Sequence, residues 1–122
     1  MKNPWILAGG MFGFLGVALG AFGAHGLKES LTPEMLEIYK TGVLYHLIHS
    51  IAILTIGLYG NIKLYKSALF FSIGIVLFSF SMYIYSITLI KALAMITPAG
   101  GVCFLIGWLM IVITALKLRK EA

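Results

Sequence analysis

The chain is 122 residues long, enough for one domain, and 61% of its residues are hydrophobic, against roughly 45–50% in a soluble globular domain. It holds nine Lys and Arg and four Asp and Glu, too few to keep so apolar a chain in water. The net charge of +5 is spread over short segments without a basic stripe, which argues against a nucleic-acid partner. These values predict an integral membrane protein with the lipid bilayer as its surroundings.

The first hydrophobic segment, residues 5–24, carries no charge and is long enough to cross a hydrocarbon core of ~30 Å. Trp5 at its start suits the interface. A cleaved secretory signal is the alternative, since Lys2 precedes the segment and small residues at 21–23 suit a peptidase. The regular spacing of the glycines in this segment, which a signal peptide does not need, favours a first transmembrane helix.

Five glycines in this segment follow one another at steps of four, three, four and three: Gly9, Gly13, Gly16, Gly20 and Gly23. This is the period of one helix face, so the five form a groove without side chains. In a membrane such a groove lets a neighbouring helix approach closely. Helix packing is the favoured interpretation. A re-entrant or ion-coordinating break around residues 20–26 stays open as the alternative.

A second helix is predicted over residues 33–59. Thr32 suits the N-cap, Pro33 the first helical position and Glu34 the first turn, and Gly60-Asn61 ends the pattern. At ~1.5 Å per residue the helix exceeds the ~30 Å core, so its first turns are expected in the headgroup layer.

The third span is predicted over residues 67–90, where Ser72, Ser79 and Ser86 recur every seven residues and share a face with Tyr83. Small-residue packing or a polar lining would each explain that stripe. Thr97-Pro98 looks like a second N-cap and helix start, so the fourth span is predicted over 98–118. The predicted fold is all-α, one integral membrane domain over 1–122, a four-helix transmembrane bundle with short loops.

Four spans place both termini on one side of the membrane. That side collects most of the basic residues, namely Lys2, Lys63, Lys66, Lys117, Arg119 and Lys120, and the other side has Lys28, Lys40 and Lys91. The positive-inside rule then puts both termini in the cytoplasm.

Three motifs resemble the DUF423 family: GAFGAHGL at 20–27, YHLIH at 45–49 and ITPAGGVCFLIGW at 96–108. This is a family of small four-span bacterial membrane proteins that is related to transmembrane protein 256 of eukaryotes. The family pattern F-S-G-S-x-Y is similar to residues 78–83, with Phe80 in the place of the usual glycine. The resemblance implies the fold and a bacterial cytoplasmic membrane. It brings no biochemical activity or cofactor.

The histidines are the main candidates for function. His46 and His49 stand three residues apart on one face of the second helix, and His25 ends the glycine helix. They could bond between helices, to Ser79, Tyr83 or a carbonyl in the groove, or line a ligand or proton path. A shared metal is disfavoured, because the helical rise puts His46 roughly 10 Å below His25. The full set of ligand or polar-core candidates is His25, Tyr45, His46, His49, Ser79, Tyr83 and Thr97.

No phosphate loop, nucleophile elbow or H-E-x-x-H pattern is present in the sequence, and no cofactor or metal is predicted. The favoured function is therefore a non-enzymatic membrane unit that handles a small ligand or ion or has a structural role. A homo-oligomer is expected if transport occurs. The alternative is a small membrane enzyme or metal-dependent redox unit that uses His25, His46 and His49. Residues 97–101, as a helix start, would also offer a weak site for an anion, although a simple turn is the favoured interpretation.

Overall fold

The computed structural model describes residues 3–121, so the prediction for Lys2 lies outside the described residues. Its helical elements are α1 (Trp5–His25), α2 (Pro33–Tyr59), the 3-10 turn η1 (Ile62–Leu64), α3 (Tyr65–Gly74), the π-helical segment η2 (Ile75–Phe80), α4 (Ser81–Thr88) and α5 (Lys91–Glu121). Four stretches are long and apolar enough to cross a membrane: Trp5–His25, Pro33–Tyr59, Ile62–Thr88 and Lys91–Glu121. The predicted all-α, four-helix bundle is confirmed.

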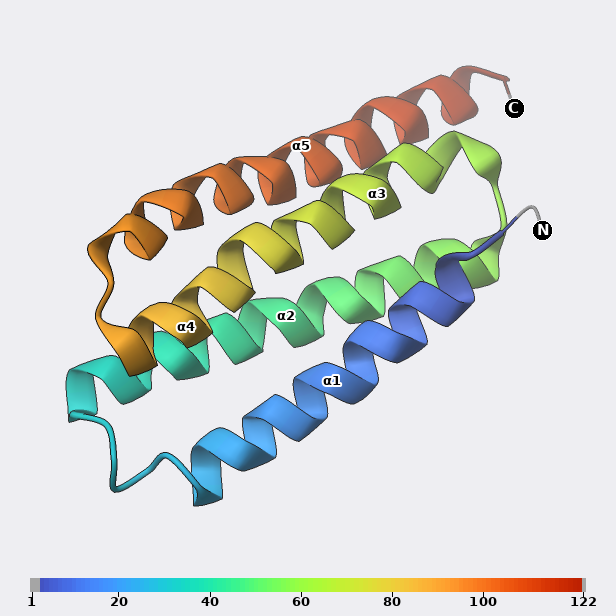
Figure 1. The fold of residues 1–122 in the computed structure, drawn as a ribbon. Coiled ribbons are helices and arrows are strands. Elements are labelled where there is room, and N and C mark those ends of the chain that lie inside the picture. Colours follow the sequence, from blue (N-terminus) through green and yellow to red (C-terminus); the bar gives the residue numbers. More distant parts are fainter. Residues whose placement is uncertain (1–2, 122) are drawn as a thin grey trace.

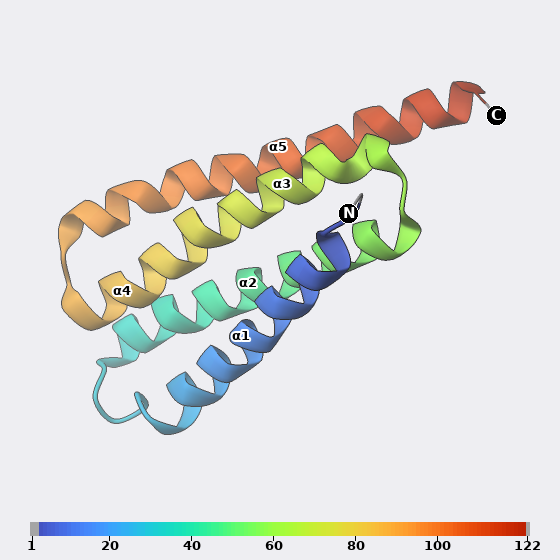
Figure 2. The same cartoon turned by 45° about the vertical axis from the view of Figure 1, so that its right-hand side comes forward.

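The spans pack in chain order. α1 lies along α2, α2 lies along the helix formed by α3, η2 and α4, and that helix lies along α5 (Figure 1). Both chain ends lie at the same end of the bundle, as the turned view in Figure 2 also shows. The main core lies between α2, α3, η2 and α5 and consists of Ile53, Ile56, Ala68, Phe71, Ile75 and Phe104. α1 is thus an outer helix whose packing depends chiefly on α2.

The glycine side of α1 is the side that faces α2. A methyl group added to Gly9 would lie 2.6 Å from the backbone nitrogen of Leu54, and one on Gly16 would lie 2.7 Å from Cδ2 of Leu47. Further along α1 the same antiparallel register continues, with Gly20 opposite Val43 and Gly23 opposite Tyr39. The two backbones therefore approach closely around Gly9, whereas around Gly20 and Gly23 the side chains of Val43 and Tyr39 lie between the two helices.

The start of α2 follows the sequence pattern. The Thr32 hydroxyl accepts a hydrogen bond from the backbone N–H of Met35 at 3.2 Å, and Pro33 and Glu34 occupy the first turn. The helix ends at Gly60, whose φ of 78° is in the left-handed region that glycine adopts without a steric penalty.

The third span differs from the predicted helix over 67–90. Helical structure begins at Ile62, α4 ends at Thr88 and Ile75–Phe80 is π-helical. A π-helix has a wider turn than an α-helix, so a seven-residue repeat does not stay on one face across it. Accordingly Ser79 and Ser86 are buried, whereas Ser72 is only half-buried. The prediction of one continuous serine face was wrong.

The fourth span corrects the prediction for Thr97 and Pro98. α5 begins at Lys91, and Pro98 lies inside it. Thr97 is not an N-cap, because its hydroxyl lies 2.6 Å from Ser81 Oγ and donates to the Leu93 carbonyl at 3.4 Å. Membrane helices tolerate an internal proline where neighbouring helices and Ser or Thr side chains supply compensating hydrogen bonds. Residues 97–101 are therefore not a helix start or a turn, and the alternative of an anion site there loses its basis.

Candidate functional site

His46 lies near the middle of α2 and is completely buried. Its Nε2 is 2.8 Å from the backbone carbonyl oxygen of Phe12 in α1, and its Nδ1 is 2.8 Å from the Tyr83 hydroxyl in α4. A carbonyl can only accept, so Nε2 carries a proton and donates it. In the neutral ring Nδ1 then accepts from Tyr83. One side chain therefore joins three helices.

Two glycines of α1 make room for side chains of α2 to reach carbonyl oxygens. A methyl group on Gly16 would lie 3.3 Å from Nε2 of His46, whose bond goes to Phe12, one turn earlier. Similarly, the Tyr39 hydroxyl donates to the Leu19 carbonyl at 2.5 Å, and the Tyr39 ring occupies the space that a side chain on Gly23 would need. In both cases glycine uncovers the carbonyl four residues before it.

His49 is bound differently. Its Nδ1 donates to the carbonyl of Tyr45 in its own helix at 2.7 Å, and its Nε2 accepts from the indole N–H of Trp108 in α5 at 2.9 Å. Its ring also stacks on Phe104 of α5, with the centroids 3.7 Å apart and the planes 11° apart. His49 therefore joins α2 to α5 through one hydrogen bond and one aromatic stack.

These contacts limit what the two imidazoles can do chemically. A metal needs a ring nitrogen with a free lone pair, yet each of the four nitrogens faces a protein donor or acceptor. Among residues 3–121 there is no group of three or more His, Cys, Asp or Glu side chains placed to hold a metal ion. His25 is exposed at the far end of α1.

The remaining candidates fall in three environments. Tyr83 bonds to His46, and the centroid of its ring lies 5.0 Å from that of Tyr39. Ser79 is fully buried, but its hydroxyl has no hydrogen-bond partner within residues 3–121, so it does not bond either histidine. The side chain of Tyr45 is 39% exposed and packs on Phe78, away from His46 and Tyr83.

The sequence did not single out Trp108 and Phe104 as partners of His49. A tryptophan in the middle of an apolar span was the available signal. Its indole N–H requires an acceptor, which lipid tails do not supply. The acceptor is identified only by the packing of α5 on α2.

The fold and the site together define a class of protein. It is a four-span integral membrane protein with two buried histidines whose ring nitrogens bond to other groups of the protein. The DUF423 family, described as "Protein of unknown function (DUF423)", matches residues 19–101. The chain is 42% identical over 118 residues to the UPF0382 membrane protein YwdK of Bacillus subtilis. The alignment covers 93% of this chain and 96% of YwdK. The chain is 37% identical over 113 residues to the UPF0382 inner membrane protein YgdD of Escherichia coli. This alignment covers 89% of this chain and 86% of YgdD.

The chain therefore belongs to the DUF423 (UPF0382) family. It is a multi-pass protein of the bacterial membrane with four spans. No solved structure matches it.

Proposed function

We propose that this protein is a non-enzymatic membrane unit whose two buried histidines hold the helices together. The observation that carries this proposal is that His46 and His49 each have protein partners on both ring nitrogens. Metal binding or proton transfer would require breaking one of these bonds in a medium that offers no replacement. Interhelical hydrogen bonds of this kind stabilise membrane proteins by around 0.6 kcal/mol each. The role of His46 and His49 is therefore to stabilise the packing of the helices.

The enzyme alternative has less support. It requires His25, His46 and His49 to act together, but His25 is exposed at the end of α1. His46 is bonded to the carbonyl of Phe12, about three and a half turns from the end of α1.

Imidazole nitrogen signals in ¹⁵N-histidine-labelled protein in lipid nanodiscs test the proposal. We expect His46 as the Nε2–H tautomer and His49 as the Nδ1–H tautomer, with neither ring responding to added Zn²⁺. The exposed His25 provides the reference signal. Stoichiometric metal in the purified protein, or a Zn²⁺-dependent change at His46 or His49, would contradict the structural role.

We also propose that both termini face the cytoplasm. η1 and the start of α3, which carry Lys63 and Lys66, lie with the C-terminal end of α5 at the end of the bundle where both termini lie (Figure 1), and Lys63 pairs with Glu121 at 3.0 Å. The opposite end carries the loop with Glu29. A cytoplasmic reporter fused to the C-terminus should be active, and a periplasmic one inactive.

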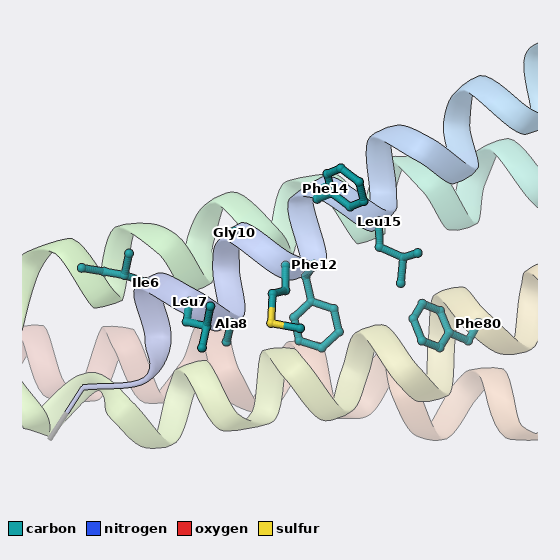
Figure 3. Close-up of a pocket in the computed structure, with 9 residues that line it drawn as sticks. Ile6, Leu7, Ala8, Gly10, Phe12, Phe14, Leu15 and Phe80 are labelled. Atoms are coloured by element: carbon teal, nitrogen blue, oxygen red, sulfur yellow. The ribbon is translucent and has the colours of Figure 1, made fainter. Parts of the chain in front are cut away.

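Association between copies is the last part of the proposal. A groove of about 820 Å³ runs along α1 on the side of Phe80 in η2, and its lining is almost wholly apolar (Figure 3). Gly10 in this groove has open space around it, which would let a helix of a second copy approach closely. Cross-linking in native membranes should give dimers that Gly10→Leu removes. Monomers alone would contradict the association.

A further inference from the structure

A second groove, the α2–α5 groove, opens between α2 and α5 in the half of the bundle nearer to both termini. Its volume is about 480 Å³, and its walls include Ile51, Thr55, Tyr59, Leu64, Trp108 and Ile111. Tyr59 and Leu64 form its outer end, because α2 ends at Tyr59 and η1 follows after the turn. The groove exists because α5 packs on the third span and makes little contact with α2.

The polar side chains in the walls of this groove are already bonded to the protein. The Thr55 hydroxyl donates to the Ile51 carbonyl of its own helix at 2.8 Å, and the indole N–H of Trp108 donates to His49 at 2.9 Å. The walls between them are aliphatic, with Ala52 and Ile111 among them. A polar group inside the groove would lose its hydrogen bonds with water and gain none, so the groove suits an acyl chain.

The length of the groove fits a chain from one leaflet. From Ile48 to Tyr59, both of which line it, the groove runs about 16 Å along α2 at ~1.5 Å per residue. This is half of a hydrocarbon core of ~30 Å. Tyr59 at the outer end is an aromatic residue of the kind that lies at headgroup level. A lipid in this groove would therefore place its headgroup near Tyr59 and its chain beside Trp108.

Basic side chains surround the outer end of the groove. Arg119 lies about three turns beyond Trp108 on α5 (Lys91–Glu121), at ~3.6 residues per turn, so both lie on one face of that helix. Arg119 is exposed, and no ion pair within residues 3–121 includes it. The acid nearby, Glu121, is instead paired with Lys63 at 3.0 Å. A guanidinium on this face is suited to bind a phosphate with two hydrogen bonds.

We propose that the α2–α5 groove binds an anionic phospholipid, with one acyl chain along the groove and the phosphate at Arg119. Phosphatidylcholine carries its own cation beside its phosphate, whereas phosphatidylglycerol has a net negative charge, so the basic end favours phosphatidylglycerol. The bound chain fills the space between α2 and α5 next to the contact of His49 with Trp108. This lipid site goes beyond the structural role of the histidines and does not depend on it.

Fluorescence of Trp108 tests the proposal directly, because the indole forms part of the groove wall. Trp5 is the other tryptophan of the chain, so Trp5→Phe gives a protein that reports from Trp108 alone. This protein is placed in phosphatidylcholine nanodiscs that contain a small fraction of phospholipid brominated on its acyl chains, since bromine quenches tryptophan on contact. We expect brominated phosphatidylglycerol to quench Trp108 more strongly than the same fraction of brominated phosphatidylcholine.

Three variants in this background separate the site from the general charge of the bundle end. Arg119→Gln should lower the enrichment of phosphatidylglycerol at Trp108 about fivefold, the effect of one basic side chain at a membrane surface. Arg119→Lys, which keeps the charge, should retain most of it. Lys117→Gln is the matched control, because Lys117 is also exposed but lies about two and a half turns from Trp108, on the opposite face of α5. It should leave the enrichment unchanged.

Three results would overturn the proposal. Equal quenching by the two brominated lipids would mean that the groove does not select the headgroup. Equal losses in Arg119→Gln and Lys117→Gln would mean a general attraction to the basic end. Absence of quenching by either lipid would mean that no acyl chain enters the groove. Circular dichroism confirms that each variant is folded. The histidine tautomer signals report separately on the structural proposal, so failure of one is not mistaken for failure of the other.

Discussion

Two sides of α2 use the same residue type in different ways, since the spacing predicts His46 and His49 on one face of this helix but their rings contact different neighbours. On the face toward α1, His46 donates to a backbone carbonyl that glycine uncovers. On the face toward α5, His49 accepts from an indole and stacks on Phe104. The first contact therefore depends on missing side chains, and the second on large ones.

This difference has a consequence for which substitutions each contact tolerates. A carbonyl bond through a glycine gap needs the two backbones to stay close, so any added side chain at Gly16 disturbs it. An aromatic contact depends on ring area, which other rings can partly replace. We expect the α1–α2 contact to be the less tolerant of the two.

The largest expected effect is that of Gly16→Leu. The added side chain would meet Leu47 and the His46 ring and separate α1 from α2 along their register. We expect a loss of more than about 3 kcal/mol, at the upper end for overpacked sites. Thermal unfolding in detergent measures it.

Gly10→Leu is the matched control for that experiment, because it adds the same side chain to the same helix where nothing lies within 4 Å. At a dilution at which both proteins are monomeric, it should unfold at the same temperature as the unchanged protein. If Gly16→Leu also unfolded at that temperature, the close contact between α1 and α2 would be disproved.

The next effect compares the histidines directly. His46→Ala leaves a cavity and removes the partner of both Phe12 and Tyr83, so we expect a loss of about 3 kcal/mol. His49→Ala removes one interhelical hydrogen bond and one stack, and we expect about 2 kcal/mol. Unfolding in a titration with sodium dodecyl sulfate gives both values. His25→Ala, at an exposed helix end, should change nothing, and a larger loss for His49→Ala would reverse the comparison.

Much of the fold could be predicted because its signals are local. Uncharged apolar lengths mark the spans, and Thr32-Pro33-Glu34 marks the start of α2. The bond between His46 and Tyr83 was also among the pairs that the sequence suggested, and the structure contains it.

What could not be predicted depends on contacts between distant segments. Thr97-Pro98 has the local form of a helix start, yet the chain before it is already helical from Lys91, and the pairing of Thr97 with Ser81 is a tertiary contact. The π-helical segment at Ile75–Phe80 likewise has no local pattern, and it lies where Gly100 of α5 meets the backbone of Phe78. In both places the packing of distant segments, not the local sequence, determines the helical structure.

The smallest expected effect has the opposite sign and concerns Ser79 in the π-helical segment η2. Its hydroxyl is fully buried without a partner in the described chain, and such a group destabilises the folded state. Ser79→Ala should therefore be neutral or raise stability by up to about 1 kcal/mol. Ser86→Ala is the contrast, because the Ser86 hydroxyl donates to the Tyr83 carbonyl at 2.8 Å and its removal should cost about 0.5 kcal/mol. If Ser79→Ala cost as much as Ser86→Ala, the buried Ser79 hydroxyl would have a hydrogen-bond partner, and the prediction would be wrong.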